Sequence, residues 1–357
     1  MRRRLRSFLK LLACLGGLHR LSRRLHRHRL LICCYHGLRA DEDPRRHWLL
    51  LPQREFARQI RYLRSHYRCI PIDQAVEELS SGRLIANTAC VTFDDGYQSN
   101  LSIGLPLLQQ YEIPATIYLT TGLVGTNGLL WNTELELAIR GTRSTAIELD
   151  ELDLGTRRLE DLEGRREVAR VVSEALKQRP YSERQRLLDR IHTTLDAPVD
   201  SSARESFALL TWEEVQRMEA TGLVRFGGHT RYHDILSRLE DVAVKTEVAR
   251  SIGDVRARLA MPSRTFAYPN GTPSDFDERS SAAVQEEGGT AAVTTIGGLC
   301  EPGDDLYSLR RVVVGSEMTF SEFRLHTAGV PGLWARVSAF WRQVAQRISM
   351  SKPVPGQ

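Results

Sequence analysis

The chain has 357 residues, of which 41% are hydrophobic and 26% are charged, so its composition is that of a globular protein rather than a disordered or fibrous one. The length fits one large domain with additions, or two domains. No run of 18 uncharged apolar residues occurs, which excludes a helix that spans a membrane.

The net charge of +5 comes from one end of the chain. Residues 1–30 contain ten Lys and Arg residues and no acidic residue, whereas the remainder carries 39 basic and 44 acidic residues. A nucleic-acid-binding protein would spread its positive charge further, so nucleic acid is not an expected partner. We interpret residues 1–29 as a basic segment that contacts an anionic membrane surface, with a disordered basic extension as the alternative.

From residue 30 onward, apolar strands alternate with amphipathic helices, which predicts parallel strands joined by right-handed crossovers. Strands are expected at 30–35, 69–72, 89–93, 115–119, 223–226, 264–268, 291–295 and 311–314. Helices are expected around 56–63, 75–79, 101–111, 212–221 and 242–259. Asp73 is expected to cap the second helix, and Thr211 with Glu214 to form a capping box at the start of the fourth. Cysteines 33, 34 and 90 lie inside apolar strands and are expected to be reduced core residues.

Two segments do not show this alternation of strands and helices. Residues 141–210 are charged, prone to form helices and poor in strands, so we interpret them as a helical insertion. The main domain is expected to cover residues 30–325, and residues 326–357 to form an amphipathic C-terminal helix and tail. That helix is expected to pack on the domain, with a second contact to a membrane surface as the alternative.

Three short motifs stand at the ends of predicted strands. Asp94 and Asp95 form an Asp-Asp-Gly turn, and such adjacent carboxylates are tolerated when they share a cation or when one takes a proton. His229 and His233 have the i, i+4 spacing that places two imidazoles on one face of a helix, which suits binding to one metal ion. The third motif is Phe-Ala-Tyr-Pro-Asn-Gly at residues 266–271.

The carboxyl ends of parallel barrel strands converge at one mouth, so these motifs are expected to meet. One aspartate with two histidines would make a facial metal site with open positions for water and substrate. With TFDDG at 92–96, HTRYH at 229–233 and FAYPNG at 266–271, the sequence resembles the polysaccharide deacetylases with a NodB homology domain. The resemblance spans about residues 30–320, apart from the insertion. It implies an α/β fold, a distorted (β/α)7 TIM-like barrel.

The resemblance also implies roles for individual residues. It makes Asp95, His229 and His233 the ligands of a divalent metal ion, with Zn²⁺ expected, and Asp94 the catalytic base. The backbone N–H of Tyr97 is the expected donor to the oxyanion. The third motif implies that Tyr268, Pro269 and Asn270 contact the substrate.

The sequence departs from the family pattern in the third motif and in the general acid. The arginine that often orients the base is replaced by Ala267, and we expect Arg311, or its neighbour Arg310, to supply that guanidinium. The late Leu-x-x-His motif that carries the general acid is not evident, so His36 is the candidate acid, with a structural histidine as the alternative. Trp131 is a candidate to stack on a sugar ring, and the alternative is that it anchors its loop.

The resemblance predicts a metal-dependent hydrolase that removes N-acetyl or other N-acyl groups from amino sugars of a polysaccharide or a lipid-linked saccharide. The alternatives are a catalytically weakened barrel that binds glycan or acts as a scaffold, and an O-acetyl esterase with the same site. The basic segment predicts a cytoplasmic protein at the inner face of the membrane, with action on precursors of exopolysaccharide or cell-envelope glycan. An exported enzyme is the alternative.

Overall fold

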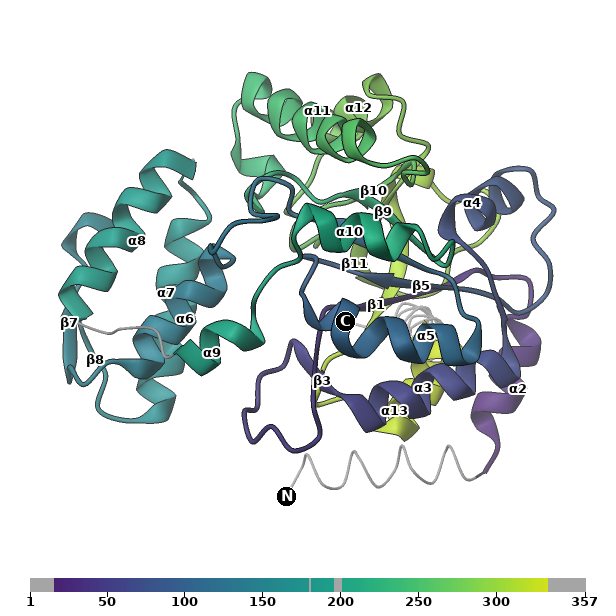
Figure 1. The fold of residues 1–357 in the computed structure, drawn as a ribbon, viewed down its shortest axis with the longest axis horizontal. Coiled ribbons are helices and arrows are strands. Elements are labelled where there is room, and N and C mark those ends of the chain that lie inside the picture. The colour runs from purple at the N-terminus through teal and green to yellow at the C-terminus, as the bar shows by residue number, and fades with distance from the viewer. Residues whose placement is uncertain (1–15, 180, 196–200, 333–357) are drawn as a thin grey trace, which may run out of the picture.

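The computed structural model describes residues 16–179, 181–195 and 201–332. The predicted helix after residue 332 and most of the basic N-terminal segment lie outside these residues. Within the described residues, seven parallel strands close into a barrel in the order β1-β12-β11-β10-β9-β6-β5, with β5 pairing back to β1 (Figure 1). The barrel strands are β1 (Leu31–Tyr35), β5 (Thr88–Phe93), β6 (Ala115–Leu119), β9 (Val224–Gly228), β10 (Thr265–Ala267), β11 (Ala291–Gly297) and β12 (Leu309–Val313).

Continuous apolar runs form these strands because helices cover the barrel and leave few strand residues in contact with water. Every residue of β1, β5, β6 and β10 is buried. The short strand β4 (Arg68–Cys69) pairs with the start of β5 outside the barrel, and β2 (Gly37–Arg39) pairs with β3 (Leu50–Pro52) after the first barrel strand. The α/β barrel predicted from the sequence is therefore confirmed.

Helices surround the barrel (Figure 1). They are α2 (Leu18–Leu25), α3 (Gln53–His66), α4 (Ile72–Ser80), α5 (Leu105–Tyr111), α10 (Trp212–Glu219), α11 (Asp241–Arg258), α12 (Glu278–Glu286) and α13 (Phe320–Thr327). A π-helical turn, η1 (Asn100–Gly104), precedes α5, and three 3-10 turns are η2 (Asp150–Leu152), η3 (Leu236–Arg238) and η4 (Leu306–Ser308). The predicted capping box of Thr211 and Glu214 begins α10.

The prediction that Asp73 caps α4 is wrong. The helix begins at Ile72, so Asp73 lies within its first turn, and the residue in the cap position is Pro71. The Asp73 carboxylate instead accepts hydrogen bonds from the backbone N–H of Arg264 and from the Ser263 hydroxyl. It therefore ties the first turn of α4 to the segment that precedes β10.

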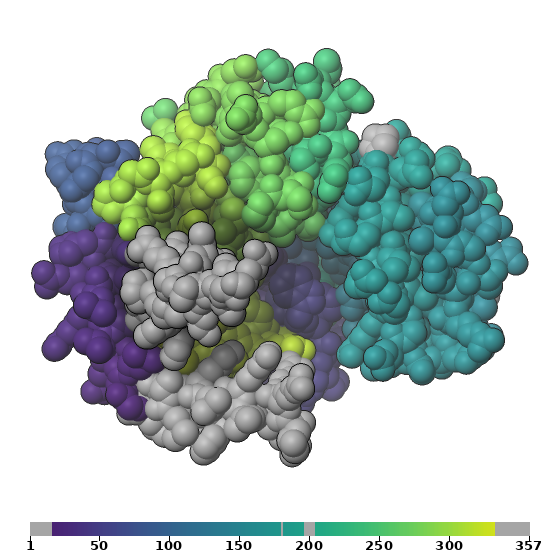
Figure 2. All heavy atoms as spheres, turned by 180° about the vertical axis from the view of Figure 1, so that it is seen from behind, coloured from purple at the N-terminus to yellow at the C-terminus, as the bar shows by residue number. Residues whose placement is uncertain are grey.

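A helical lobe lies beside the barrel, on the left in Figure 1 and in teal on the right in Figure 2. Its elements are α6 (Trp131–Gly141), β7 (Ala146–Glu148), β8 (Thr156–Arg158), α7 (Leu162–Leu176), α8 (Tyr181–Leu195) and α9 (Ser201–Ser206). The lobe has a hydrophobic core of its own, which includes Leu135, Val172 and Leu188. Its first helix starts at residue 131, and β7 and β8 form an antiparallel pair.

Helix α2 packs against the barrel near α13, where the Ser22 hydroxyl donates a hydrogen bond to the backbone carbonyl of Ala328. Five of the cysteines lie within the described residues; all five are free, and all but Cys69 are buried. In this same part of the chain, no helix combines the length and the apolar character needed to cross a bilayer.

Candidate metal centre and active site

The polar residues predicted from the motifs gather at the carboxyl ends of the barrel strands. Asp94 and Asp95 follow β5, His229 follows β9, and His36 follows β1. Arg311 lies within β12. All of these strands run parallel, so their ends open on the same mouth of the barrel.

Three predicted metal ligands meet at this mouth. The Nε2 atoms of His229 and His233 lie 3.5 and 3.6 Å from Oδ1 of Asp95. Two ligand atoms of a tetrahedral zinc site are separated by about 3.4 Å, because each lies about 2.0–2.1 Å from the ion. The spacing of these three atoms therefore matches a common ion, and the three side chains form a possible metal-binding cluster.

The polar groups of the cluster also fit a metal ion. Oδ1 of Asp95 is buried and accepts no hydrogen bond from the described residues, so this oxygen is available to bind a cation. Nδ1 of His229 lies 2.7 Å from the carbonyl oxygen of Ala267, and donation of the Nδ1 proton to that carbonyl leaves Nε2 free to bind a metal. Burial lowers the pKa of His233 to about 3, so its imidazole is neutral, which is the form that binds metals.

The two aspartates keep their charge despite burial. For Asp95, burial alone would raise the pKa, but the imidazoles of His229 and His233, 3.5 and 3.6 Å from Oδ1, hold it below its usual range. For Asp94, burial would also raise the pKa. The charge and hydrogen bonds of Arg311 outweigh this effect and hold the pKa of Asp94 well below the usual range. A carboxylate that remains ionised can accept a proton during a reaction.

Arg311 binds the carboxylate of Asp94 through two hydrogen bonds from its guanidinium. Nη1 and Nη2 donate to Oδ1 and Oδ2 at 2.7 and 2.6 Å, and the two side chains are 0% and 3% exposed. Nε of Arg311 donates to the Thr294 carbonyl, so the guanidinium plane is fixed by β11 as well. Such a fork-to-fork pair fixes the orientation of a carboxylate. The guanidinium thus comes from the last barrel strand, as expected when Ala267 replaces the arginine of the third motif.

The turn after β5 depends on its glycine. Asp95 and Gly96 have φ values of 75° and 81°, in the left-handed region that favours glycine. A Cβ atom on Gly96 would lie 2.6 Å from a side-chain methyl of Leu119. The sharp turn brings the carboxylate of Asp95 toward the two histidines.

The two histidines do not share a helix face, so that part of the prediction is wrong. Residues 229–235 form a loop in which Thr230 and His233 have φ values of 60° and 57°. This backbone bends His233 back toward the end of β9, and the two imidazole rings meet edge to face with centroids 5.0 Å apart. The i, i+4 spacing therefore brings the rings together through a loop.

The helical lobe supports this loop through contacts that the sequence did not predict. Arg184 of α8 and Asp234, the residue directly after the candidate ligand His233, form a buried ion pair. The Arg184 guanidinium also lies over the Trp131 ring, 5.0 Å from its centroid. Next to it, the rings of Tyr181 and Tyr232 stack with centroids 3.9 Å apart. Asp234 follows the HxxxH motif in the sequence, but nothing near it in the sequence indicates its partner, which lies 50 residues away.

His36 lies beside Asp94, and the two form a second compact group with Cys34. Nδ1 of His36 is buried and has no hydrogen-bond partner among the described residues. Burial lowers the pKa of His36, so a proton placed on it is readily given up. Its ring meets the indole of Trp48 edge to face at 5.5 Å.

Several predicted substrate contacts lie in the protein interior. Tyr268 is fully buried, stacks on Phe276, and donates a hydrogen bond to the Tyr307 carbonyl, so its ring belongs to the core. Trp131 is only 4% exposed, and its indole N–H donates to the His233 carbonyl, which leaves too little ring surface to stack on a sugar. The alternative for Trp131, an anchor for its loop, agrees with these contacts.

The remaining predicted contacts differ in exposure. Pro269 is buried, and Asn270 is partly exposed with a φ of 56°. The Tyr97 ring is also buried, but its peptide lies at the turn after Gly96, and the residues on either side pair with the segment 208–210. These bonds fix the direction of the Tyr97 peptide at the mouth of the barrel.

Comparison with known proteins agrees with the fold. The family model described as polysaccharide deacetylase matches residues 82–292, which include Asp94, Asp95, His229 and His233. The chain belongs to the polysaccharide deacetylase family. A search of the curated proteins with this chain found no match.

Solved structures of low identity share the fold of this family member. A Streptococcus pyogenes deacetylase, PplD, in complex with acetate has 18% identity and a TM-score of 0.55, over 84% of this chain and 98% of its own. IcaB from Ammonifex degensii has 19% identity and a TM-score of 0.55, over 85% and 98%. BC0361, a polysaccharide deacetylase from Bacillus cereus, has 16% identity and a TM-score of 0.53, over 84% and 69%.

Proposed function

We propose that the protein is a metal-dependent hydrolase that removes N-acetyl groups from amino sugars of a polysaccharide or a lipid-linked saccharide. The observation that carries the proposal is the meeting of Asp95, His229 and His233 around one point, beside an ionised Asp94. Family membership supports an acetylated polysaccharide as the substrate class. The two imidazoles and one carboxylate favour Zn²⁺ as the ion.

Asp94 is the proposed general base. When bound, the divalent ion would polarise the amide carbonyl and lower the pKa of water at the site. Asp94 would take a proton from the attacking water, and Arg311 would keep the carboxylate in the orientation that this transfer needs. Because Arg311 uses both carboxylate oxygens, rotation of the Asp94 side chain away from the site is opposed by two charge-assisted hydrogen bonds.

Two further groups complete the proposed chemistry. The N–H of Tyr97 would donate to the oxyanion that develops on the carbonyl oxygen. His36 would give a proton to the leaving amine, since its ring lies next to Asp94 and its buried Nδ1 is available. The lowered pKa of His36 favours donation once the ring is protonated.

An acetate-release assay tests this proposal. The full-length protein loaded with Zn²⁺ is incubated with N-acetylhexosamine oligomers, and Asp94→Asn is compared with Asp150→Asn, an exposed aspartate on the lobe. We expect Asp94→Asn to lower turnover about a hundredfold or more, with the bound metal retained, while the control keeps full activity. Absence of acetate release by the metal-loaded wild-type protein, with glycan affinity unchanged in Asp94→Asn, would point to a binding barrel. Faster release from O-acetylated sugars would point to an esterase.

We further propose that the protein acts at the inner face of the membrane through its basic N-terminal segment. Helix α2 supports this, because Leu21 and Leu25 are 58% and 65% exposed and lie one turn apart, next to the exposed Arg20 and Arg24. We expect co-sedimentation with vesicles that contain anionic lipid, and less of it with neutral vesicles or after Leu21→Ser with Leu25→Ser. Equal behaviour with both kinds of vesicle would contradict the proposal.

A further inference from the structure

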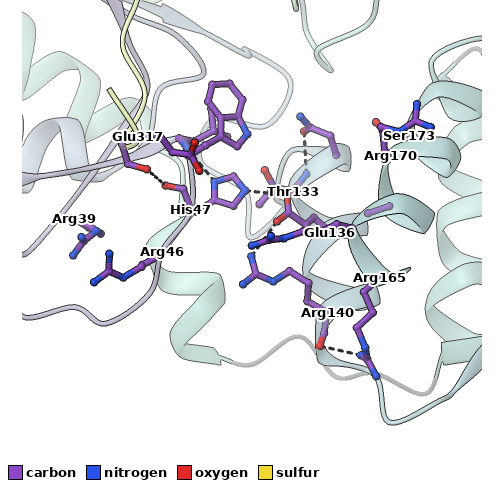
Figure 3. Close-up of a pocket in the computed structure, with 16 residues that line it drawn as sticks. Arg39, Arg46, His47, Thr133, Glu136, Arg140, Arg165, Arg170, Ser173 and Glu317 are labelled. Carbon is purple, nitrogen blue, oxygen red and sulfur yellow. Dashed lines mark hydrogen bonds and ion pairs between the residues drawn. The ribbon is translucent and has the colours of Figure 1, made fainter. Parts of the chain in front are cut away.

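A groove of about 710 Å³ lies between the barrel and the helical lobe, and arginines dominate its lining (Figure 3). We call it the arginine groove. Six arginines line it, from both sides, against two glutamates: Arg39, Arg46, Arg140, Arg165, Arg166, Arg170, Glu136 and Glu317. Its volume lies within the range of sites that hold small molecules, and its excess of positive charge favours an anionic ligand.

Several of these guanidinium groups are not neutralised by any carboxylate of the described residues. Arg46 and Arg166 are exposed, and neither forms an ion pair or a hydrogen bond with the described residues. Arg39 donates to the backbone carbonyls of Ala40 and Asp43 and to no carboxylate in that part of the chain. By contrast, Arg45, next to Arg46, is held by Asp43 at 2.8 Å outside the groove. Positive charge is therefore concentrated where the barrel and the helical lobe face each other.

Other arginines of the groove are fixed in place. Arg165 donates to four backbone carbonyls, three of them at or near the end of α6, which anchors α7 against that helix. Arg140 is paired with Glu136 at 3.1 Å, and Glu136 also meets His47 at 2.9 Å from the barrel side. These contacts hold the two walls at a defined separation, so a ligand can meet guanidinium groups from both walls without a movement of the lobe.

The groove also offers an aromatic surface that contacts a residue of the candidate active site. Trp48 lines the groove and is 51% exposed, and the centroids of its ring and that of His36 lie 5.5 Å apart. Helix α6 begins at Trp131, which contacts the loop of His233, and reaches Arg140 about 13 Å further along its axis. A ligand could therefore rest a sugar ring on Trp48 while one end enters the barrel mouth.

We propose that the arginine groove binds phosphate groups carried by the acetylated saccharide that this protein deacetylates. The inference rests on the proposed function and specifies its substrate as a sugar phosphate or a saccharide attached through a diphosphate. Phosphate is favoured over a single carboxylate because its two negative charges and several oxygens can engage guanidinium groups from both walls at once. An exposed indole beside these guanidinium groups matches a sugar joined to a phosphate.

Calorimetric titration of the full-length, metal-loaded protein tests the inference. The probes are N-acetylglucosamine 1-phosphate, N-acetylglucosamine, N-acetylmuramic acid and inorganic phosphate. We expect the sugar phosphate to bind at least about tenfold more tightly than each of the other three, and the preference to weaken as salt is raised. The titrations are made with the Asp94→Asn protein, to prevent turnover, and repeated with the wild type.

The double variant Arg46→Gln, Arg166→Gln should lose this preference. The matched control is Arg61→Gln, Arg250→Gln, which removes the same charge from exposed arginines of α3 and α11 that do not line the groove. Circular dichroism checks that both variants are folded. The inference is wrong if the wild type binds the sugar phosphate no better than N-acetylglucosamine, or if the preference survives in the groove variant. It is also wrong if inorganic phosphate or N-acetylmuramic acid binds as tightly as the sugar phosphate.

The titrations test the groove and the acetate-release assay tests the hydrolase, so each proposal can be refuted without the other. A phosphate preference that depends on Arg46 and Arg166 would support the groove even in a protein that releases no acetate from any substrate. In the reverse case, acetate release without a phosphate preference would support the hydrolase and overturn the groove.

Discussion

Arg184 offers the most direct test of whether the lobe supports the candidate metal centre. Arg184→Met keeps much of the side-chain volume but removes the charge that faces Asp234. The two side chains are 2% and 3% exposed, and burial already raises the pKa of Asp234 even with Arg184 present. Breaking a buried pair on one side costs about 3–5 kcal/mol, because it leaves the other charge buried without a partner.

The expected consequence is a looser loop and weaker metal binding. We expect faster amide hydrogen exchange in residues 229–235 and α8, and a loss of zinc affinity of about 10–100-fold, as for other residues that orient metal ligands. The matched control is Arg186→Met on the same helix, whose pair with Glu151 is exposed at 56% and 33%. A pair of that kind contributes about 0–1 kcal/mol, so the control should resemble the wild type.

A second substitution separates the charge effect from lost packing. Adding Asp234→Asn to Arg184→Met removes the stranded carboxylate and should recover part of the stability and of the zinc affinity. The reasoning is refuted if Arg184→Met and Arg186→Met have the same zinc affinity and the same exchange rates in the loop. In that case the loop would hold His233 without help from the lobe.

Three other substitutions test individual features. Arg311→Lys keeps a positive charge but cannot hold Asp94 with two parallel bonds, so kcat should fall about tenfold or more while metal content, measured by elemental analysis, stays constant. Gly96→Ala should destabilise the fold by about 1–3 kcal/mol in thermal unfolding, because φ is 81° and the new methyl would lie 2.6 Å from a leucine of β6. Burial raises the pKa of Glu247 to about 7 from 4.5, so the folded state binds this proton more tightly than the unfolded chain. Stability should therefore be lost between about pH 5 and pH 8, by up to about 3 kcal/mol, and Glu247→Gln should flatten this part of the denaturation profile.

The barrel and the meeting of the motifs could be predicted because they depend on local sequence. An uninterrupted apolar run such as 31–35 is typical of a parallel strand that is covered on both faces, and parallel strands bring their carboxyl ends to one edge. That topology places Asp95 near His229 without any knowledge of side-chain contacts. The guanidinium of Arg311 could be assigned for the same reason, since it also lies on a barrel strand.

Burial and backbone conformation of single residues were harder to predict. Tyr268 follows a strand just as Asp94 does, but its ring turns into the core and stacks on Phe276, a contact that depends on where the next loop returns. The left-handed conformation of His233 is likewise not encoded by a glycine, so the motif resembles one turn of a helix. Both features are set by tertiary contacts that compete successfully with local preference.

The helical lobe is the part of the molecule in which sequence reasoning reached least far, and it is also where we locate the choice of substrate. Helix α6 contacts both proposed sites: Trp131 at its start contacts the loop of His233, whereas Glu136 and Arg140 line the arginine groove. Because one rigid helix links the two, a change in the lobe core that tilts α6 should alter zinc affinity and phosphate preference together. Substitutions confined to the groove face should change phosphate preference alone, which separates the support of the metal centre from the recognition of the saccharide.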